Sequence, residues 1–210
     1  MPGQRDTSSP ALRPIVTVAA EHGAAGDLVA QRVADTLGVP LLDRALPSSL
    51  AAAGESGRQT RLVGRLARAS TMLAQEPIER IDRDEGRSRA ELAEFLVAAS
   101  TEGGVVLGRG GVLVLADEPR ALHVLLGGPR EGRVARVAER EGTDRDEASR
   151  RVRAEDRARK EYLRRVFGVD PDDRTLYHLV VDTVALGIDA TVELVVAASH
   201  ARTRHAPKGS

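Results

Sequence analysis

The stretch IVTVAAEHGAAGDLVAQRVADTLG, residues 15–38, decides the fold, because it has the pattern of a strand, a glycine-containing turn and a helix in direct succession. The β-branched run at its start is typical of a buried strand. The segment after the turn carries one apolar stripe that we expect to pack on a sheet: Leu28, Val29, Val33 and Leu37. Gly38 is a typical helix stop, so the helix is predicted to end there.

Short apolar runs continue to alternate with helical stretches along the rest of the chain. The clearest predicted strands are GVVLGR at 104–109, ALHVLLG at 121–127 and LYHLVVDT at 176–183. Strands that alternate with helices predict parallel βαβ units, and fully apolar strands fit a sheet that is covered on both faces. We therefore expect an α/β fold with a mainly parallel sheet of about five strands and helices on both faces.

The length of 210 residues suits one domain. Three parts are expected: a disordered tail over 1–13, a single domain over 14–199 and a second tail over 200–210. Within the domain, the segments 48–100 and 142–167 stand apart from the predicted sheet. Thr143 is expected to cap a helix in the second segment, whose residues are nearly all charged. Such a helix is exposed, or it closes over a charged ligand.

Composition excludes several classes of function. Basic and acidic residues balance at 31 each, so no overall field draws the chain to nucleic acid or to anionic lipid. The chain has no cysteine, which excludes thiolate nucleophiles and cysteine-bound zinc, and any metal would be held by oxygen. No apolar run approaches the roughly 20 residues needed to cross a bilayer. We expect a cytoplasmic protein without a membrane partner.

The turn EHGAAGDL, residues 21–28, is the first candidate site. Backbone N–H groups and the positive end of a helix dipole converge at such a turn and bind phosphate. A full phosphate loop reads GxxxxGK[ST]; here the lysine position falls at or beside Gly26, and Asp27 stands where a neutral or cationic residue is expected. The alternative is an ordinary βα turn in which Asp27 stabilises the helix N-terminus.

Arg109 is the second candidate. It follows a predicted strand and is flanked by Gly108, Gly110 and Gly111. An arginine at the carboxyl end of a parallel strand points into the crevice where open α/β sheets bind ligands, and its planar fork suits a phosphate. The alternative is a turn arginine paired with a surface carboxylate.

Four residues spaced by threes on the charged helix form the third candidate: Arg153, Asp156, Arg159 and Tyr162. This spacing places the side chains near one another on one slowly drifting face. Arginines there can clamp phosphates while an aspartate accepts from a sugar hydroxyl. The alternative is a solvated helix with internal ion pairs.

Three blocks that contain these candidates, in this order, resemble the cytidylate kinase-like family, relatives of bacterial CMP kinase. The blocks are residues 16–44, 105–137 and 153–183. The resemblance implies a three-layer P-loop kinase-like fold in which 142–167 is a helical lid and 48–100 is a helical segment on the acceptor side. It also implies phosphoryl transfer from ATP, with Mg²⁺, to a nucleoside monophosphate (CMP-like) or a related small acceptor.

The resemblance also implies roles for individual residues. Donor phosphates would lie on the loop residues Gly23, Ala24, Ala25, Gly26 and Asp27. Arg109 and Arg159 would bind or bridge phosphates, and Asp156 would address the acceptor sugar. Substrate contacts are further expected from Asp43, Arg44, Arg153 and Tyr162, of which the first two match a family D-R pair.

The chain departs from the family pattern in and near the loop. The loop lacks a lysine and has Ala25 and Asp27 where the family has glycine and arginine, and the last strand ends in Asp182-Thr183 where Asn-Thr is more usual. Because phosphoryl transfer depends mostly on positioning and electrostatics, we expect Arg109 and Arg159 to supply the missing charge.

Two other functions stay open from the sequence. A catalytically silent nucleotide-binding protein would keep the fold and lose turnover, as the altered loop suggests. A nucleic-acid-binding protein would use the arginine-rich helices, including the face formed by Arg58, Arg61, Arg65 and Arg68. Neutral charge and only four aromatic residues argue against this second function. Residues 58–100 are also a possible homodimer surface.

Overall fold

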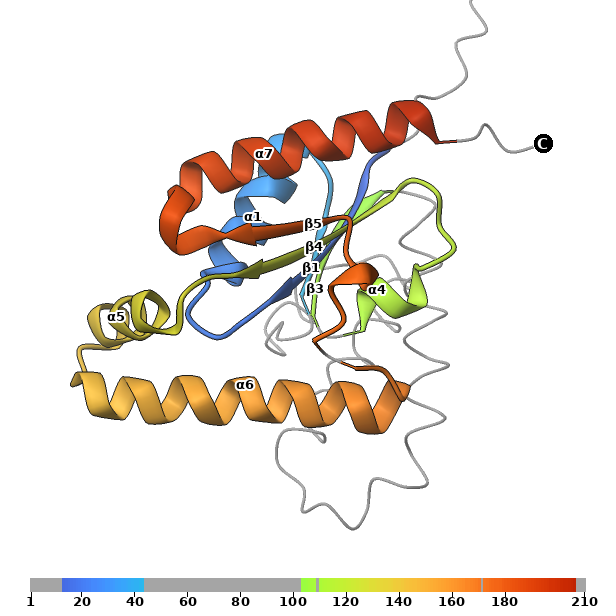
Figure 1. Ribbon diagram of the computed structural model, residues 1–210. Coiled ribbons are helices and arrows are strands. Elements are labelled where there is room, and N and C mark those ends of the chain that lie inside the picture. Colours follow the sequence, from blue (N-terminus) through green and yellow to red (C-terminus); the bar gives the residue numbers. More distant parts are fainter. Residues whose placement is uncertain (1–12, 44–102, 109, 171, 207–210) are drawn as a thin grey trace, which may run out of the picture.

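The computed structural model describes residues 13–43, 103–108, 110–170 and 172–206 (Figure 1). Its centre is a five-stranded sheet in the order β2-β3-β1-β4-β5. The strands are β1 Ile15–Ala20, β2 Leu41–Asp43, β3 Gly104–Leu107, β4 Ala121–Gly127 and β5 Leu179–Asp182. All four pairings are parallel, which confirms the predicted α/β architecture.

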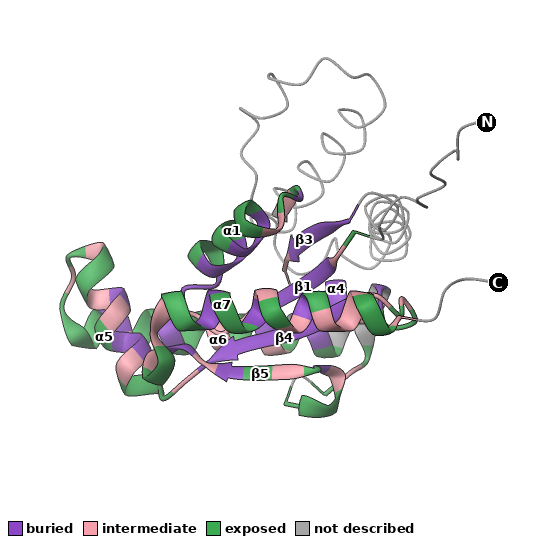
Figure 2. Cartoon of the chain, turned by 90° about the horizontal axis from the view of Figure 1, so that it is seen from above, coloured by how far each residue is buried: buried purple, intermediate pink, exposed green. Residues whose placement is uncertain are grey.

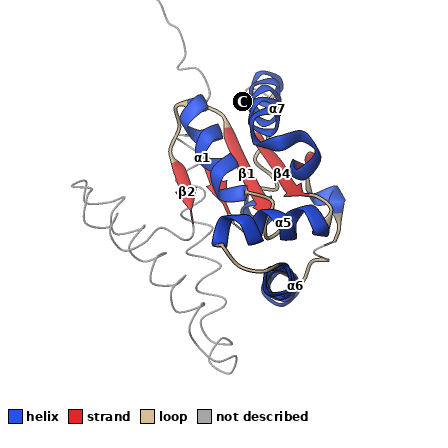
Figure 3. Ribbon diagram, turned by 90° about the vertical axis from the view of Figure 1, so that its left-hand side faces the viewer, coloured by secondary structure: helices blue, strands red, loops and turns tan. Residues whose placement is uncertain are grey.

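Helices lie on both faces of this sheet, so the fold has three layers (Figures 1 and 3). The described helices are α1 Gly26–Leu37, α4 Gly111–Val114, α5 Arg130–Glu141, α6 Arg145–Phe167 and α7 Thr183–His205, with a 3₁₀ turn at Arg174–Leu176. Helices α1 and α7 cover one face, and α4 and α6 lie on the other. The carboxyl ends of β1 and β4 lead toward α1 and α5 at one edge of the sheet.

Alternate residues of β1 pack on opposite faces of the sheet. Val16 and Val18 pack with α1 and α7 in the main core, whereas Ile15 and Ala19 pack on the side of α4. Because both faces are covered, the strand is apolar except for the buried Thr17, and it is buried from Ile15 to Ala19. Figure 2 shows β1 in the colour of buried residues.

The predicted stripe on α1 is correct except at Leu28. Val29 and Val33 are fully buried, while the Leu28 side chain is 46% exposed. The helix instead turns its smallest residues to the sheet, including Ala30 and Ala34, because they allow a close approach to β1 and β3. Gly38 ends the helix in the left-handed conformation, as expected.

The N-terminus of α6 corrects a second prediction. Asp144, not Thr143, is the capping residue, and its carboxylate accepts from the backbone N–H of Glu147 at 2.8 Å. The Thr143 hydroxyl donates to the carbonyl oxygen of Asp144 instead. The helix therefore begins one residue later than a threonine cap would place it.

The last helix continues to His205, so the tail expected over 200–210 begins later than composition suggested. Within the part of the chain that the structure describes, α7 is long and apolar enough to cross a membrane by length and composition alone. Val192 and Val195 of this helix belong to the core between α7 and the sheet. This packing accounts for part of the apolar composition of α7. The expected tail over 1–13 and the segment 48–100 lie almost wholly outside the described residues.

A buried histidine gives the fold a testable pH dependence. His123 is 3% exposed, its Nδ1 lies 2.8 Å from the Thr17 hydroxyl, and its ring stacks on His178. Burial, with the nearby charges of His178 and Arg202, lowers the pKa of His123 to about 4. An unfolded histidine titrates near 6.5, so the unfolded chain takes up the proton first as the pH falls.

We expect the free energy of unfolding to fall by about 2 kcal/mol between pH 7 and pH 5 on account of His123. Denaturant unfolding at the two pH values measures this loss. The variant His123→Asn keeps a polar group near Thr17 and cannot titrate, so its stability should change less. An equal loss in both proteins would show that another group causes the effect.

Candidate functional site

The loop between β1 and α1 has the backbone of an anion-binding turn. Gly23 and Ala25 both have positive φ, at 83° and 56°, and α1 begins at Gly26 without a hydrogen bond from a capping side chain. The first amides of a helix have no partner within the helix. Together with the helix dipole, they form a concave row of donors that suits a phosphate.

The side chains of this loop show why a lysine is absent. Aligned with GxxxxGK[ST], Ala20 stands at the first glycine, Ala25 at the second, and Gly26 at the lysine. A Cβ atom on Gly26 would lie 2.4 Å from the Cβ of Ala20. The methyl group of Ala20 therefore fills the space that any side chain at residue 26 needs.

Ala25 retains the left-handed conformation that glycine normally adopts at this point of the loop. For a non-glycine residue this conformation costs roughly 1–2 kcal/mol. The surrounding contacts must hold it in place, and most of them come from α5. The loop thus keeps the shape of a phosphate loop although its side-chain pattern has changed.

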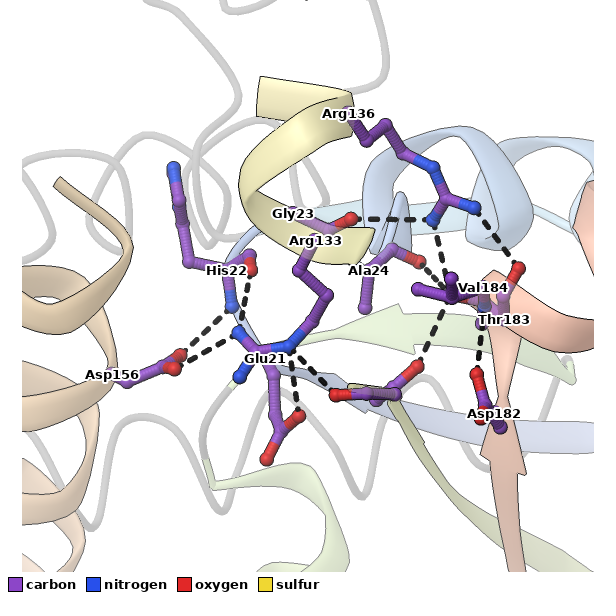
Figure 4. Close-up of polar contacts among 12 residues, drawn as sticks. Glu21, His22, Gly23, Ala24, Arg133, Arg136, Asp156, Asp182, Thr183 and Val184 are labelled. Carbon is purple, nitrogen blue, oxygen red and sulfur yellow. Dashed lines mark hydrogen bonds and ion pairs between the residues drawn. The ribbon is translucent and has the colours of Figure 1, made fainter. Parts of the chain in front are cut away.

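Three arginines on one face of α5 contact the loop, at i, i+3 and i+7: Arg133, Arg136 and Arg140. Figure 4 shows the first two of these arginines. The sequence interpretation missed them, because nothing local indicates that the helix after β4 turns this face to the first loop. Their regular spacing directly after a buried strand was the available signal. Among the described residues, the arginines that contact the loop therefore come from α5.

Arg133 is the most buried of the three, at 5% exposure. Its Nη1 donates to the carbonyl oxygen of His22 at 2.8 Å and to Oδ2 of Asp156 at 2.9 Å. Its Nε donates to the carbonyl oxygen of Gly128 and lies 3.2 Å from Oε2 of Glu21. One guanidinium therefore joins β4, α6 and the start of the loop.

Asp156, expected to address an acceptor sugar, lies against the loop in this structure. Its Oδ1 accepts from the backbone N–H of His22 at 3.0 Å, and its Oδ2 accepts from Arg133. Both oxygens are thus occupied by protein donors (Figure 4). The contacts place Asp156 as the residue that fastens α6 to the loop.

Arg136 and Thr183 hold the other side of the loop. Arg136 Nη1 donates to the carbonyl oxygen of Gly23 at 3.2 Å and to the Thr183 hydroxyl at 3.1 Å. The buried Thr183 hydroxyl in turn lies 3.0 Å from the carbonyl oxygen of Ala24. Asp182 caps α7 by accepting from the N–H groups of Val184 and Ala185. The Asp182-Thr183 pair therefore links β5, α7 and the loop.

Asp27 lies in the first turn of α1 and forms an ion pair with Arg140 across to α5, with Oδ2 and Nη1 3.3 Å apart. Both side chains are half exposed or more. Asp27 thus does not simply cap its own helix, as the alternative interpretation had it, because it also connects α1 to α5.

Arg159 is buried, and no carboxylate of the described residues forms a salt bridge with it, although its charge, after a hydrogen bond from Lys160, helps to lower the pKa of Asp172. It is 5% exposed, and its Nε and Nη1 form no hydrogen bond. Its side chain hydrogen-bonds Tyr177; burial raises the pKa of that phenol, and the bond and charge of Arg159 act in the opposite direction. Buried polar groups are normally satisfied, so an open guanidinium here is a candidate anion-binding group.

A cleft of ≈ 970 Å³ opens beside the loop, between the start of α5 and one face of α6. It is lined by Glu21, Pro129, Arg130, Glu131, Arg133, Arg153, Asp156, Arg157, Lys160, Glu161 and Arg164. Two predicted residues, Arg153 and Asp156, therefore meet there, whereas Arg159 and the loop residues 23–27 are not part of the lining. Six cations face four acids, which favours an anionic ligand.

Four predicted residues are not tested by these contacts. Arg44 and Arg109 lie outside the described residues, as do the side chains of Asp43 and Tyr162.

Residues 15–185 match the model of a family described as the cytidylate kinase-like family. Among curated proteins, a cytidylate kinase of Methanopyrus kandleri is 38% identical over 109 residues, which cover 48% of this chain and 56% of that protein. For this kinase and two further curated relatives, the matched segment covers 56%, 20% and 57% of the relative's own length. The chain therefore spans less than two thirds of each of these relatives.

Solved structures show the same fold at low sequence identity. An uncharacterized protein from Eubacterium ventriosum is 19% identical with a TM-score of 0.66, covering 89% of this chain and 98% of that one. A gluconokinase from Sinorhizobium meliloti is 16% identical with a TM-score of 0.52, covering 93% and 96%. The predicted α/β, P-loop kinase-like fold is thereby confirmed.

Proposed function

This chain belongs to the cytidylate kinase-like family, and we propose that it transfers a phosphoryl group from ATP to a nucleoside monophosphate or a related small acceptor. The observation that carries the proposal is the loop between β1 and α1, where a left-handed Ala25 precedes a helix without a side-chain cap. This backbone offers amide donors to the phosphates of a donor nucleotide.

The reaction needs positioning and positive charge more than covalent help from the protein. Arg133 and Arg136 keep the loop in shape, because they donate to the carbonyl oxygens of His22 and Gly23. The ligand is assigned to the amides at the start of α1, since those of His22 and Ala24 already donate to Asp156 and Glu21. Arg159 is the cation proposed to meet the transferred phosphoryl group, since two of its nitrogens, Nε and Nη1, lack a hydrogen-bond partner among the described residues. ATP fits this set of donors, and bound Mg²⁺ would neutralise part of the phosphate charge.

The cleft is the proposed acceptor side of the site. Its cations suit the phosphate of a nucleoside monophosphate, and Arg153 lies within it as the sequence suggested. Among the described residues that line it there is no aromatic side chain on which a base could stack. A phosphate contact from Arg109 and substrate contacts from Asp43, Arg44 and Tyr162 stay predictions.

A radiolabelled ATP assay over a panel of nucleoside monophosphates and small hydroxyl acceptors tests the proposal, with ATP binding measured in parallel. Transfer to CMP or a related acceptor is the expected result. Binding without transfer would instead identify a silent nucleotide-binding protein, which the exclusion of a lysine at Gly26 favours. Steeply salt-dependent binding of RNA or DNA, without nucleotide binding, would point to nucleic acid as the ligand.

Arg159→Met separates a functional arginine from a structural one. Because a buried guanidinium stabilises a fold little when no anion pairs with it, and none does among the described residues, the variant should unfold at about the temperature of the parent protein or above it. Phosphoryl transfer should fall about 100-fold or more, as expected when a charge that stabilises the transition state is lost.

The control for this variant is Arg150→Met, on an exposed turn of the same helix outside the cleft lining. It should keep both stability and transfer. Transfer by Arg159→Met within about threefold of the parent protein would remove Arg159 from the reaction.

A further inference from the structure

Asp27 is the residue of the loop that the proposed function leaves unexplained. It lies in the first turn of α1 with a side chain that is 64% exposed, beside the amides proposed to hold the donor phosphates. A carboxylate at this point repels phosphates unless a cation lies between them. A working phosphate loop with Asp27 therefore needs a cation that binds both groups.

Arg140 is the cation that Asp27 contacts in this structure, and the contact is easily exchanged. Arg140 is half exposed, and its second nitrogen, Nη2, lies 3.6 Å from Oε1 of Glu141. The arginine is thus shared between two carboxylates, and water screens both pairs. Meanwhile α5 itself is anchored to the loop by Arg133 and Arg136, so Arg140 stays close to Asp27.

The position of Asp27 in the loop points to a second cation, Mg²⁺, that could lie between its carboxylate and the phosphates. In the pattern GxxxxGK[ST], the residue after the lysine gives its hydroxyl oxygen to magnesium. Asp27 occupies this place in the chain, directly after Gly26. A carboxylate oxygen is a ligand that Mg²⁺ prefers, and this ion is commonly held by one carboxylate together with substrate phosphates and water. The donor set therefore fits the metal.

We propose that Asp27 is the protein ligand of the magnesium ion that accompanies the donor phosphates, and that Arg140 holds its carboxylate when the metal is absent. The inference rests on the proposed function, because it requires a nucleoside triphosphate on the loop. With its charge shared with the metal, Asp27 no longer repels the phosphates and instead helps to fix them.

Binding of a non-hydrolysable ATP analogue, measured by calorimetry with excess Mg²⁺ and again with a chelator, tests this assignment. For Asp27→Asn the two affinities should move in opposite directions. The metal-free analogue should bind more tightly, because a repulsive charge is gone. The magnesium complex should bind about tenfold more weakly, because a metal ligand is gone.

Two further variants control the experiment. Asp35→Asn makes the same charge change two turns later on α1, where the carboxylate bonds only the Gln31 amide among the described residues, so neither affinity should change. Arg140→Ala removes the competing cation, so the metal-free analogue should bind more weakly while the magnesium complex should bind at least as tightly as before.

The outcomes separate the inference from the proposed function. If both affinities of Asp27→Asn change in the same direction, or neither changes, Asp27 is only an ion-pair partner of Arg140 and the inference is wrong. If the unaltered protein binds neither form of the analogue, the proposed function itself is wrong.

Discussion

Replacing Arg133 by methionine is expected to lower the free energy of unfolding by about 3–5 kcal/mol and to abolish nucleotide binding. Arg133 is 5% exposed, and its guanidinium lies between two carboxylates, those of Glu21 and Asp156. Its removal leaves both acids without this cation and frees the carbonyl oxygens of His22 and Gly128. Denaturant unfolding and ATP calorimetry measure the two effects.

Arg130→Met is the matched control, because Arg130 lies one turn earlier on α5, lines the same cleft and is exposed. It should cost less than about 0.5 kcal/mol, as is usual for surface positions. Adding Asp156→Asn to Arg133→Met should recover part of the loss, since one unpaired charge is then gone. If Arg133→Met unfolds at the same denaturant concentration as Arg130→Met, the buried network does not stabilise the fold.

The main outline of the fold could be predicted because it depends on local patterns. The strand β1, the turn and the helix α1 each carry their own signal in residues 15–38, and Gly38 marks the end of the helix. The predictions were wrong where packing against neighbouring elements, rather than the local pattern, determines which residues are buried. Leu28 belongs to the apolar stripe by periodicity, yet small residues face the sheet instead.

The site was only partly predictable, because its polar network joins distant parts of the chain. The bond from the His22 amide to Asp156 spans 134 positions, and that from Arg133 to His22 spans 111. The spacing of Arg133 and Arg136 within α5 marks a basic face, but it does not reveal that this face meets the first loop. The sequence did identify Asp156 and Arg159, but only the structure distinguishes the satisfied carboxylate from the guanidinium that lacks a partner.

Introducing lysine at Gly26 is expected to fail in the natural sequence and to succeed when Ala20 is changed as well. In Gly26→Lys the new Cβ meets the Cβ of Ala20 at 2.4 Å, so the loop must shift. Such overpacking costs about 1–3 kcal/mol, and the shift should also disturb the amides that bind phosphate. Thermal unfolding and ATP binding of the single variant should both decline.

The double variant Ala20→Gly/Gly26→Lys returns glycine and lysine to the places they have in GxxxxGK. Without the methyl group of Ala20, the clash disappears and the lysine can reach the donor phosphates, so transfer should exceed that of the parent protein by about tenfold or more. Ala20→Gly/Gly26→Ala fits equally well without the charge and should show no such gain. If Gly26→Lys alone matched the double variant in stability and transfer, Ala20 would not be what excludes lysine. If the double variant exceeds the single variant as expected, the methyl group of Ala20 is what excludes the lysine, and arginines elsewhere in the fold supply the lost charge.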